Sequence, residues 1–185
     1  MEFATLLMAL CALLLPATNP ARAQGEAATA PRVVLAQSVG PPGGSVSVPI
    51  QLSGVESASL GALTLRLAFP AARLTFSKAV IGGVGEATGV EVTTETQPRG
   101  AETLLDVKMS TREQDGVKAA IPDGPIAQLV FSVARDLKPE TVIRVKLQAS
   151  GTGQRSGAAP VKVLARDGEI VVSNPPVIGC FFYMH

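Results

Sequence analysis

The stretch that decides the fold runs from Gly61 to Phe76 and reads GALTLRLAFPAARLTF. Its first half alternates apolar side chains with small or polar ones, and the apolar set is Leu63, Leu65, Leu67 and Phe69. A period of two residues is typical of a half-buried β-strand, whose side chains point alternately to the two faces of a sheet. A Pro-Ala-Ala turn follows, and Leu74 begins a second strand. The stretch therefore predicts two consecutive strands joined at a proline corner.

Short apolar runs of the same kind recur along the rest of the chain, separated by Gly, Pro and Asp. This spacing predicts an all-β fold, an antiparallel β-sandwich with jelly-roll topology and about nine strands. No segment of the mature chain has a convincing helical period, and Glu113 to Ala120 has room for at most one helical turn. The expected strand segments are Val33–Ser38, Ser45–Leu52, Leu60–Phe69, Leu74–Ile81, Val90–Thr96, Thr103–Ser110, Ile126–Ala134, Val142–Ala149, Val161–Leu164 and Glu169–Val172.

Turn residues lie between these runs. Pro41-Pro42-Gly43-Gly44 separates the first two expected strands, and Gly151 to Ala159 has the composition of a flexible loop. Asp123-Gly124 and Asp167-Gly168 each precede a strand, and at both we expect the glycine to take the positive φ that other residues avoid. Asn174-Pro175-Pro176 ends the last strand, because proline has no N–H to donate to a sheet.

The first 23 residues have the form of a secretory signal peptide. Leu6 to Leu15 is an apolar run, and Ala21-Arg22-Ala23 is a small-residue cleavage site before Gln24. The run is about ten residues long, whereas a helix that spans a bilayer needs about 20. We therefore expect a secreted, periplasmic or cell-surface protein, with an uncleaved anchor as the alternative. Residues 24–31 form a small polar leader that we expect to be disordered.

The mature chain has the size and charge of an ordinary globular domain. Cleavage after Ala23 leaves 162 residues with a net charge of +1, enough for one domain with its own core. No run of basic residues suggests a nucleic-acid or anionic-membrane partner, and no membrane span remains after cleavage. Only Cys180 remains of the two cysteines, so no internal disulfide can form and the core must stabilise the domain.

Four stretches, in order along the chain, resemble the cohesin domain family. Gly43 to Gly54, GGSVSVPIQLSG, is similar to the opening strand of the family, and Leu63 to Phe76 is similar to its strand, proline corner and strand. Ile121 to Val133, IPDGPIAQLVFSV, resembles the turn that leads into a long central strand. Asp167 to Val172, DGEIVV, looks like the closing strand. The family's Tyr-Asp-Pro corner appears here as Phe69-Pro70-Ala71, without the aspartate.

The resemblance implies a cohesin-like domain over residues 32–173, followed by a C-terminal tail over 174–185. It also implies a non-enzymatic module that binds a protein partner, such as a dockerin-bearing protein, and a link to extracellular polysaccharide degradation. In the family one sheet face takes the dockerin, through polar contacts around an apolar centre. An exposed sheet face without a partner is the alternative. The outward residues of the matching strands, our candidate partner contacts, are Thr64, Arg66, Asp106 and Lys108.

No combination of residues in the sequence points to catalysis or to a metal centre. His185 is the only histidine, and with Cys180 it gives two ligands, fewer than a zinc site needs. The calcium-loop pattern is absent. A structural calcium ion held by Asp115 or Asp123 together with backbone carbonyls is left as an open alternative. A glycosidase needs two carboxylates that flank a sugar, and no such pair stands out. The acidic residues near strand starts or at outward positions are Glu91, Glu95, Glu102 and Asp106.

The rival hypothesis is a carbohydrate-binding or adhesive β-sandwich of related shape. It is disfavoured because the chain has no Trp and one Tyr, Tyr183, so no obvious aromatic platform exists for stacking a sugar ring. A structural sandwich of the immunoglobulin type would lack its buried Trp and disulfide. The tail carries Phe181-Phe182-Tyr183, which either packs on the edge of the sandwich or serves as an interaction segment.

Overall fold

A computed structural model describes residues 30–55, 59–155 and 157–174 of the chain. These residues form short and long strands and one helix of a single turn, α1 (Gly83–Ala87). The strands are β1 (Arg32–Leu35), β2 (Ser38–Gly40), β3 (Ser45–Ser53), β4 (Leu60–Pro70), β5 (Leu74–Ile81), β6 (Val90–Arg99), β7 (Glu102–Thr111), β8 (Glu113–Gln114), β9 (Val117–Lys118), β10 (Gly124–Val133), β11 (Val142–Gly153), β12 (Pro160–Lys162), β13 (Leu164–Arg166) and β14 (Gly168–Val172).

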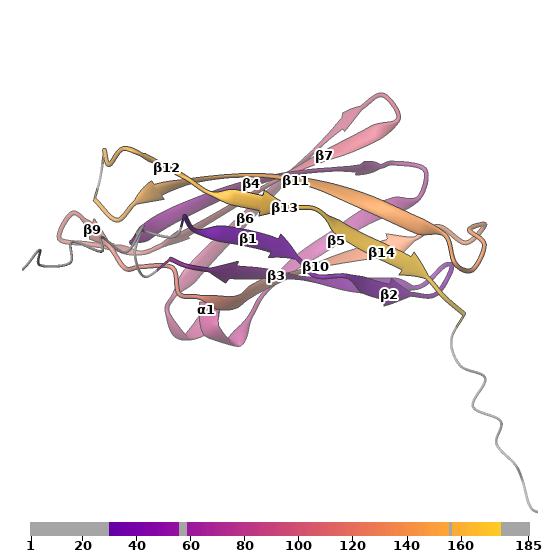
Figure 1. Cartoon of the computed structure of the whole chain (residues 1–185), viewed down its shortest axis with the longest axis horizontal. Coiled ribbons are helices and arrows are strands. Elements are labelled where there is room, and N and C mark those ends of the chain that lie inside the picture. The colour runs from indigo at the N-terminus through magenta and orange to yellow at the C-terminus, as the bar shows by residue number, and fades with distance from the viewer. Residues whose placement is uncertain (1–29, 56–58, 156, 175–185) are drawn as a thin grey trace, which may run out of the picture.

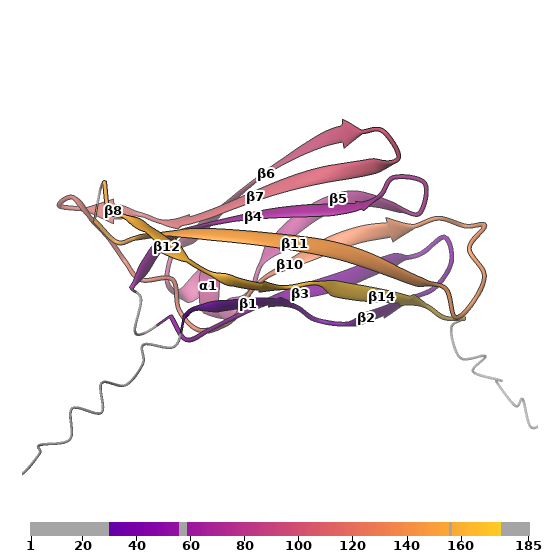
Figure 2. The ribbon, with the colours of Figure 1, turned by 45° about the horizontal axis from the view of Figure 1, so that its top comes forward.

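Two sheets face each other and enclose one apolar core, which confirms the predicted all-β sandwich (Figure 1). The five-stranded sheet has the order β13-β1-β3-β10-β5. The seven-stranded sheet has the order β2-β14-β11-β4-β7-β6, and β12 pairs with β11. At the far edge of the second sheet, the β6–β7 hairpin rises away from the rest of the molecule (Figure 2).

The stretch from Gly61 to Phe76 forms β4, a turn and the start of β5, as its alternation predicts. Leu63, Leu65 and Leu67 are 0% exposed, so the apolar face of β4 lies wholly in the core. The backbone N–H of Arg73 donates to the carbonyl of Pro70 at 3.1 Å and closes the turn. Across the core, Phe69 of one sheet meets Phe131 of the other edge to face, with ring centroids 5.2 Å apart. This strand is therefore a central element of the fold.

The sandwich is antiparallel, as predicted, except at one side of the molecule. There β1 runs parallel to β13 and β2 runs parallel to β14, and Figure 1 shows the indigo and yellow ribbons side by side. The expected single strand Val33–Ser38 is broken, because β1 belongs to one sheet and β2 to the other. The sequence carries this break as a change of phase: Val33 and Leu35 face the core, and then Ser38 does. A chain that crosses between facing sheets must reverse which side it turns inward.

Two local predictions need correction, and the limit of one helical turn expected for Glu113 to Ala120 is not exceeded. Glu113 to Ala120 is not helical: it contains the β8–β9 hairpin, whose turn residues Asp115 and Gly116 have φ of 54° and 77°. The helical turn lies at α1, between β5 and β6. The expected loop from Gly151 to Ala159 begins later, because β11 continues to Gly153. The count of about nine strands is too low, since the chain also forms the short strands at the sheet crossing and in the hairpin.

The structure gives different reasons for the two glycines that we expect at positive φ. Gly124 has a φ of 116°, as predicted. Gly168 does not have a positive φ; a Cβ atom added there would lie 2.6 Å from Cβ of Leu35. Gly168 therefore permits the close approach of the N-terminal and C-terminal strands where they cross between sheets.

Several predicted features lie outside the described residues: the signal peptide, nearly all of the leader and, except for Asn174, the C-terminal tail with Cys180 and His185. Within the described ranges, no helix has the length and apolar character that crossing a membrane requires.

Candidate functional site

The four candidate contacts lie together on the outward face of the seven-stranded sheet. We call the outward residues of β11, β4, β7 and β6 the β4–β7 face. Cross-strand pairing arranges them in rows, and neighbours within a row have Cβ atoms about 5 Å apart. One row consists of Ser150, Thr64, Lys108 and Thr93. The next row consists of Gln148, Arg66, Asp106 and Glu95. The structure therefore brings all four predicted residues into two adjacent rows.

Arg66 and Asp106 form the central ion pair of this face. Arg66 donates from Nε to Oδ1 of Asp106 at 2.7 Å and from Nη2 to Oδ2 at 2.9 Å. Two parallel hydrogen bonds fix both side chains in one plane, which a single contact would not do. The Arg66 side chain is 57% exposed and that of Asp106 only 15%, so the guanidinium covers the carboxylate.

The pair changes the ionisation of both groups. Its hydrogen bonds lower the pKa of Asp106 below the ordinary value of 3.8, and the charges of Arg66 and Lys108 add to this effect, against a smaller opposing contribution from desolvation. The same hydrogen bonds raise the pKa of Arg66 above its ordinary value. Asp106 is therefore a carboxylate and Arg66 a cation under any ordinary condition, and together they present a neutral, oriented unit to solvent.

Most other charges on this side of the sheet are also paired within the chain. Lys146 of β11 reaches Glu102 of β7 at 3.3 Å, spanning β4 above Ala68 and Pro70, whose small side chains leave room for the contact. Further along, Arg112 meets Glu91 at 3.0 Å, and Arg144 meets Glu169 at 3.5 Å. These exposed pairs balance the charge of the face but contribute little to stability.

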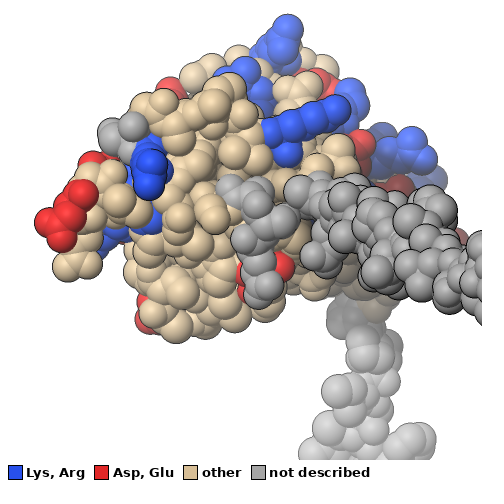
Figure 3. Space-filling model, turned by 60° about the vertical axis from the view of Figure 1, so that its left-hand side comes forward, with Lys and Arg blue, Asp and Glu red and all other residues tan. Residues whose placement is uncertain are grey.

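Two shallow hollows flank the central ion pair. One has a volume of about 310 Å³ and lies between β11 and β4, beside Thr64, Arg66 and Gln148. The other has a volume of about 270 Å³ and lies between β7 and β6, beside Thr93, Glu95 and Lys108. Figure 3 shows another side of the molecule, where Lys and Arg side chains are interspersed with Asp and Glu on a mostly uncharged surface. The β4–β7 face is thus a broad polar surface with shallow relief.

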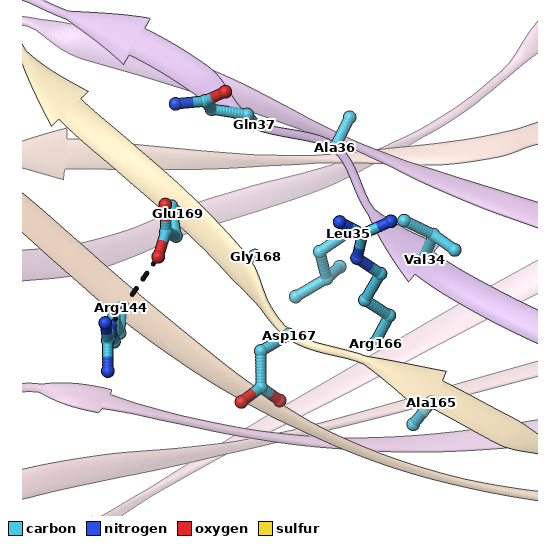
Figure 4. A pocket seen from close by; sticks show the side chains of 10 residues that line it. All are labelled: Val34, Leu35, Ala36, Gln37, Arg144, Ala165, Arg166, Asp167, Gly168 and Glu169. Atoms are coloured by element: carbon cyan, nitrogen blue, oxygen red, sulfur yellow. Dashed lines mark ion pairs between the residues drawn. The ribbon is translucent and has the colours of Figure 1, made fainter.

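A larger hollow, of about 680 Å³, lies where the N-terminal and C-terminal strands cross between the sheets (Figure 4). The strand pairing lapses between the pairs Val34–Arg166 and Ser38–Ile170, and the hollow opens at this gap. Its acidic groups are already engaged: Glu169 pairs with Arg144, and Oδ1 of Asp167 accepts the N–H of Leu147 at 2.8 Å. This hollow is a consequence of the sheet crossing, and its two carboxylates already have partners within the chain.

Within the described part of the chain, the carboxylates singled out in the sequence do not gather into a metal-binding group. Among the described residues, no group of three or more His, Cys, Asp or Glu lies close enough to hold a metal ion. Asp123 accepts hydrogen bonds from the N–H groups of Gly54 and Val55 at 3.1 and 2.9 Å. Its carboxylate is therefore bound to the loop after β3. Asp115 lies at the exposed turn of the β8–β9 hairpin.

The residues that sequence reasoning missed come from β11 and β6. Ser150 and Gln148 extend the two rows on one side, and Thr93 and Glu95 extend them on the other. Alternation along β11 does indicate that these residues point outward. The neighbours of a strand within a sheet, however, cannot be determined from alternation, because the pairing partners are far apart in sequence.

The comparisons with known proteins agree with this architecture. The family model of the cohesin domain matches residues 31–172, so the chain belongs to the cohesin family. None of the curated proteins matches the chain. The fold is accordingly the β-sandwich with jelly-roll topology that the sequence predicts.

Solved cohesin structures share this fold at low sequence identity. The third cohesin of ScaC from Acetivibrio cellulolyticus, solved with the ScaB dockerin, is 23% identical, with 77% of this chain and 99% of that chain covered and a TM-score of 0.63. The Coh-OlpA cohesin of Clostridium thermocellum, solved with Doc918, is 14% identical over 77% of this chain and 99% of that chain, with a TM-score of 0.60. A non-cellulosomal cohesin from the archaeon Archaeoglobus fulgidus is 17% identical over 78% and 92%, with a TM-score of 0.56.

Proposed function

We propose that this chain is a non-enzymatic module that binds a dockerin-type protein partner through the β4–β7 face. The observation that carries the proposal is the pair of adjacent polar rows, fixed by the Arg66–Asp106 ion pair, on four long neighbouring strands. A sheet of this kind presents a rigid surface, so a partner does not have to order it on binding. Membership of the cohesin family and the dockerin complexes of similar structures support the partner class.

Binding of a carbohydrate is the weaker candidate. The aromatic residues in the described part of the chain are Phe69, Phe76 and Phe131, and they pack against one another at the core. Phe69 and Phe131 are buried and Phe76 is only partly exposed, so none of the three forms an open platform for stacking a sugar ring. The described residues therefore favour a protein partner, and a link to polysaccharide degradation would run through that partner.

We further propose the organisation that the sequence predicts: a signal peptide over residues 1–23, a leader over 24–31, the binding domain over 32–173 and a tail over 174–185. On this proposal the domain acts outside the cytoplasm, where secreted or surface-attached partners are accessible. N-terminal sequencing of the protein recovered from the medium or the cell envelope tests it, and a first residue other than Gln24 would contradict the proposed cleavage.

The function is tested by measuring the affinity of the purified domain for a panel of dockerins by titration calorimetry. The panel includes the ScaB dockerin of Acetivibrio cellulolyticus and Doc918 of Clostridium thermocellum, which are components of the similar complexes. The test variant is Thr64→Arg, which places a bulky charge in the first row of the face. The matched control is Gln51→Arg, an exposed position on β3 in the other sheet.

We expect at least one dockerin to bind the wild-type domain and the Gln51→Arg variant equally, and Thr64→Arg to lose at least about tenfold in affinity. A panel in which no dockerin binds would contradict the dockerin class. Equal binding by both variants would contradict the β4–β7 face, provided that both melt at the wild-type temperature.

A further inference from the structure

Among the described residues of β11, β4, β7 and β6, Lys108 is the one cation in the two central rows of the β4–β7 face that has no ion pair. Arg66 is neutralised by Asp106, and beside the rows Lys146 is held by Glu102. Within the described part of the chain, the Lys108 ammonium has no hydrogen bond and no carboxylate within ion-pair distance. Its electrostatic interaction with Asp106 acts over a longer distance and helps to lower the pKa of that carboxyl. A partner that covers this face would remove Lys108 from water without an internal counter-ion.

The surroundings of Lys108 supply further hydrogen-bond donors. Thr64 on β4 and Thr93 on β6 are its cross-strand neighbours on the two sides, and both are exposed. Their hydroxyls and the ammonium lie in one row, with neighbouring Cβ atoms about 5 Å apart. An incoming oxygen anion at this point could therefore accept from the ammonium and from hydroxyls on either side.

The neighbouring carboxylates need a cation from the partner less than Lys108 needs an anion. Asp106 already accepts two hydrogen bonds from Arg66, and its side chain is only 15% exposed. Glu95 accepts a hydrogen bond from Nε2 of Gln97 at 3.1 Å. Burial of the face thus leaves an ammonium with no partner, whereas each nearby carboxylate keeps at least one donor. Covering the face without a counter-ion would therefore cost free energy at Lys108, because its charge would be buried unpaired.

We propose that the protein partner of the β4–β7 face places an Asp or Glu carboxylate against Lys108, between Thr64 and Thr93. This inference rests on the proposed function, and it names the chemistry that the partner must contribute. It makes Lys108 a residue that determines specificity: a partner with a basic group at this point would leave two cations buried together.

The test uses a yeast-displayed library of the Acetivibrio cellulolyticus ScaB dockerin with randomised surface positions. Clones are selected for binding to the wild-type domain and against binding to the Thr64→Arg variant, so that only clones that recognise the face are kept. The retained clones are sequenced and titrated against Lys108→Met, Lys108→Arg and Glu95→Gln. Lys108→Arg keeps the charge, and Glu95→Gln removes a neighbouring charge of opposite sign.

We expect the retained clones to be enriched in Asp and Glu, and to lose at least about tenfold in affinity for Lys108→Met while binding Lys108→Arg and Glu95→Gln. Enrichment in Lys and Arg, or undiminished binding to Lys108→Met, would overturn the inference and leave the proposed face intact. If every clone that binds the wild-type domain also binds Thr64→Arg, the selection retains none of them; the face is then not recognised, and the proposed function fails together with the inference.

Discussion

The ion pair between Arg66 and Asp106 is complete within the chain, before any partner is present. Its two hydrogen bonds hold the guanidinium over the carboxylate, so the pair has one orientation that a partner can recognise. Unpaired charged side chains would lose conformational freedom when a partner binds, which costs free energy. The side chains of this pair are already ordered, so binding does not add that cost. The geometry thus favours recognition by shape and hydrogen bonding over recognition by net charge.

The ionisation of Asp106 gives a direct readout of this pair. Its pKa is lowered in the folded state, so the contribution of the pair to stability is fully present above the unfolded-state value and is lost as the pH falls through the lower, folded-state pKa. We expect a carboxyl NMR titration of the folded domain to place the Asp106 midpoint below 3.8, and the Arg66→Met variant to move the midpoint upward. A midpoint that does not respond to Arg66→Met would show that the pair is not formed in solution.

A second residue-scale prediction concerns Gly168, at the sheet crossing. An alanine there would place its Cβ 2.6 Å from Cβ of Leu35, a rigid atom next to the backbone, so the strands would have to move apart. We expect Gly168→Ala to destabilise the domain by about 1–3 kcal/mol, the usual cost of overpacking, in a denaturant titration. The control is Gly83→Ala, because nothing lies within 4 Å of a Cβ added at Gly83. Equal stability of the two variants would contradict the close packing of the crossing.

At the scale of the element, β4 joins the core to the candidate site. Its odd-numbered residues are buried and its even-numbered residues include Thr64 and Arg66, so one strand supplies both surfaces. We expect Leu65→Ala to cost about 2–5 kcal/mol of unfolding free energy, the range for an emptied core site, and Phe131→Ala a similar amount. Thr64→Ala, one residue from Leu65 on the outward side, should change stability by less than about 0.5 kcal/mol. Similar losses at Leu65 and Thr64 would contradict the assigned orientation of β4.

The individual strands could be predicted from the sequence, but their neighbours could not. Alternation predicted that Leu63 to Phe69 turn one side inward, and the structure buries that side. The crossing of the N-terminal strand was also encoded, as the change of phase between Leu35 and Ser38, but an isolated phase change does not reveal which sheet the chain joins. The parallel pairing of β1 with β13 joins residues more than a hundred positions apart, and no local pattern records it.

The candidate site was predictable to a similar extent. The outward positions of Thr64 and Lys108 follow from alternation, and the resemblance to cohesins implied that they belong to one sheet face; their direct pairing across β4 and β7 comes from the structure. The contributions of β11 and β6 depend on the order of strands in the sheet, and the ion pair of Lys146 with Glu102 depends on two strands that do not touch. These features arise only when the whole sheet is assembled.

At the scale of the whole molecule, one continuous core lies between the two sheets, and the proposed binding face is the outward side of one of them. The proposed function is binding without catalysis, so we expect no release of reducing sugar from polysaccharides by the purified domain. Sustained release that a single Asp or Glu substitution abolishes would contradict the assignment as a binding module.

Binding of a protein partner at the β4–β7 face is the proposal on which the function rests. It is tested most directly by chemical-shift mapping of the isotope-labelled domain, titrated with the dockerin that binds most tightly in the affinity panel. We expect the largest shifts on Thr64, Arg66, Asp106 and Lys108 and on their row neighbours in β11 and β6, while Gln51 on the other sheet stays unchanged. Shifts concentrated on the five-stranded sheet, or around the hollow between Arg144 and Arg166, would contradict it.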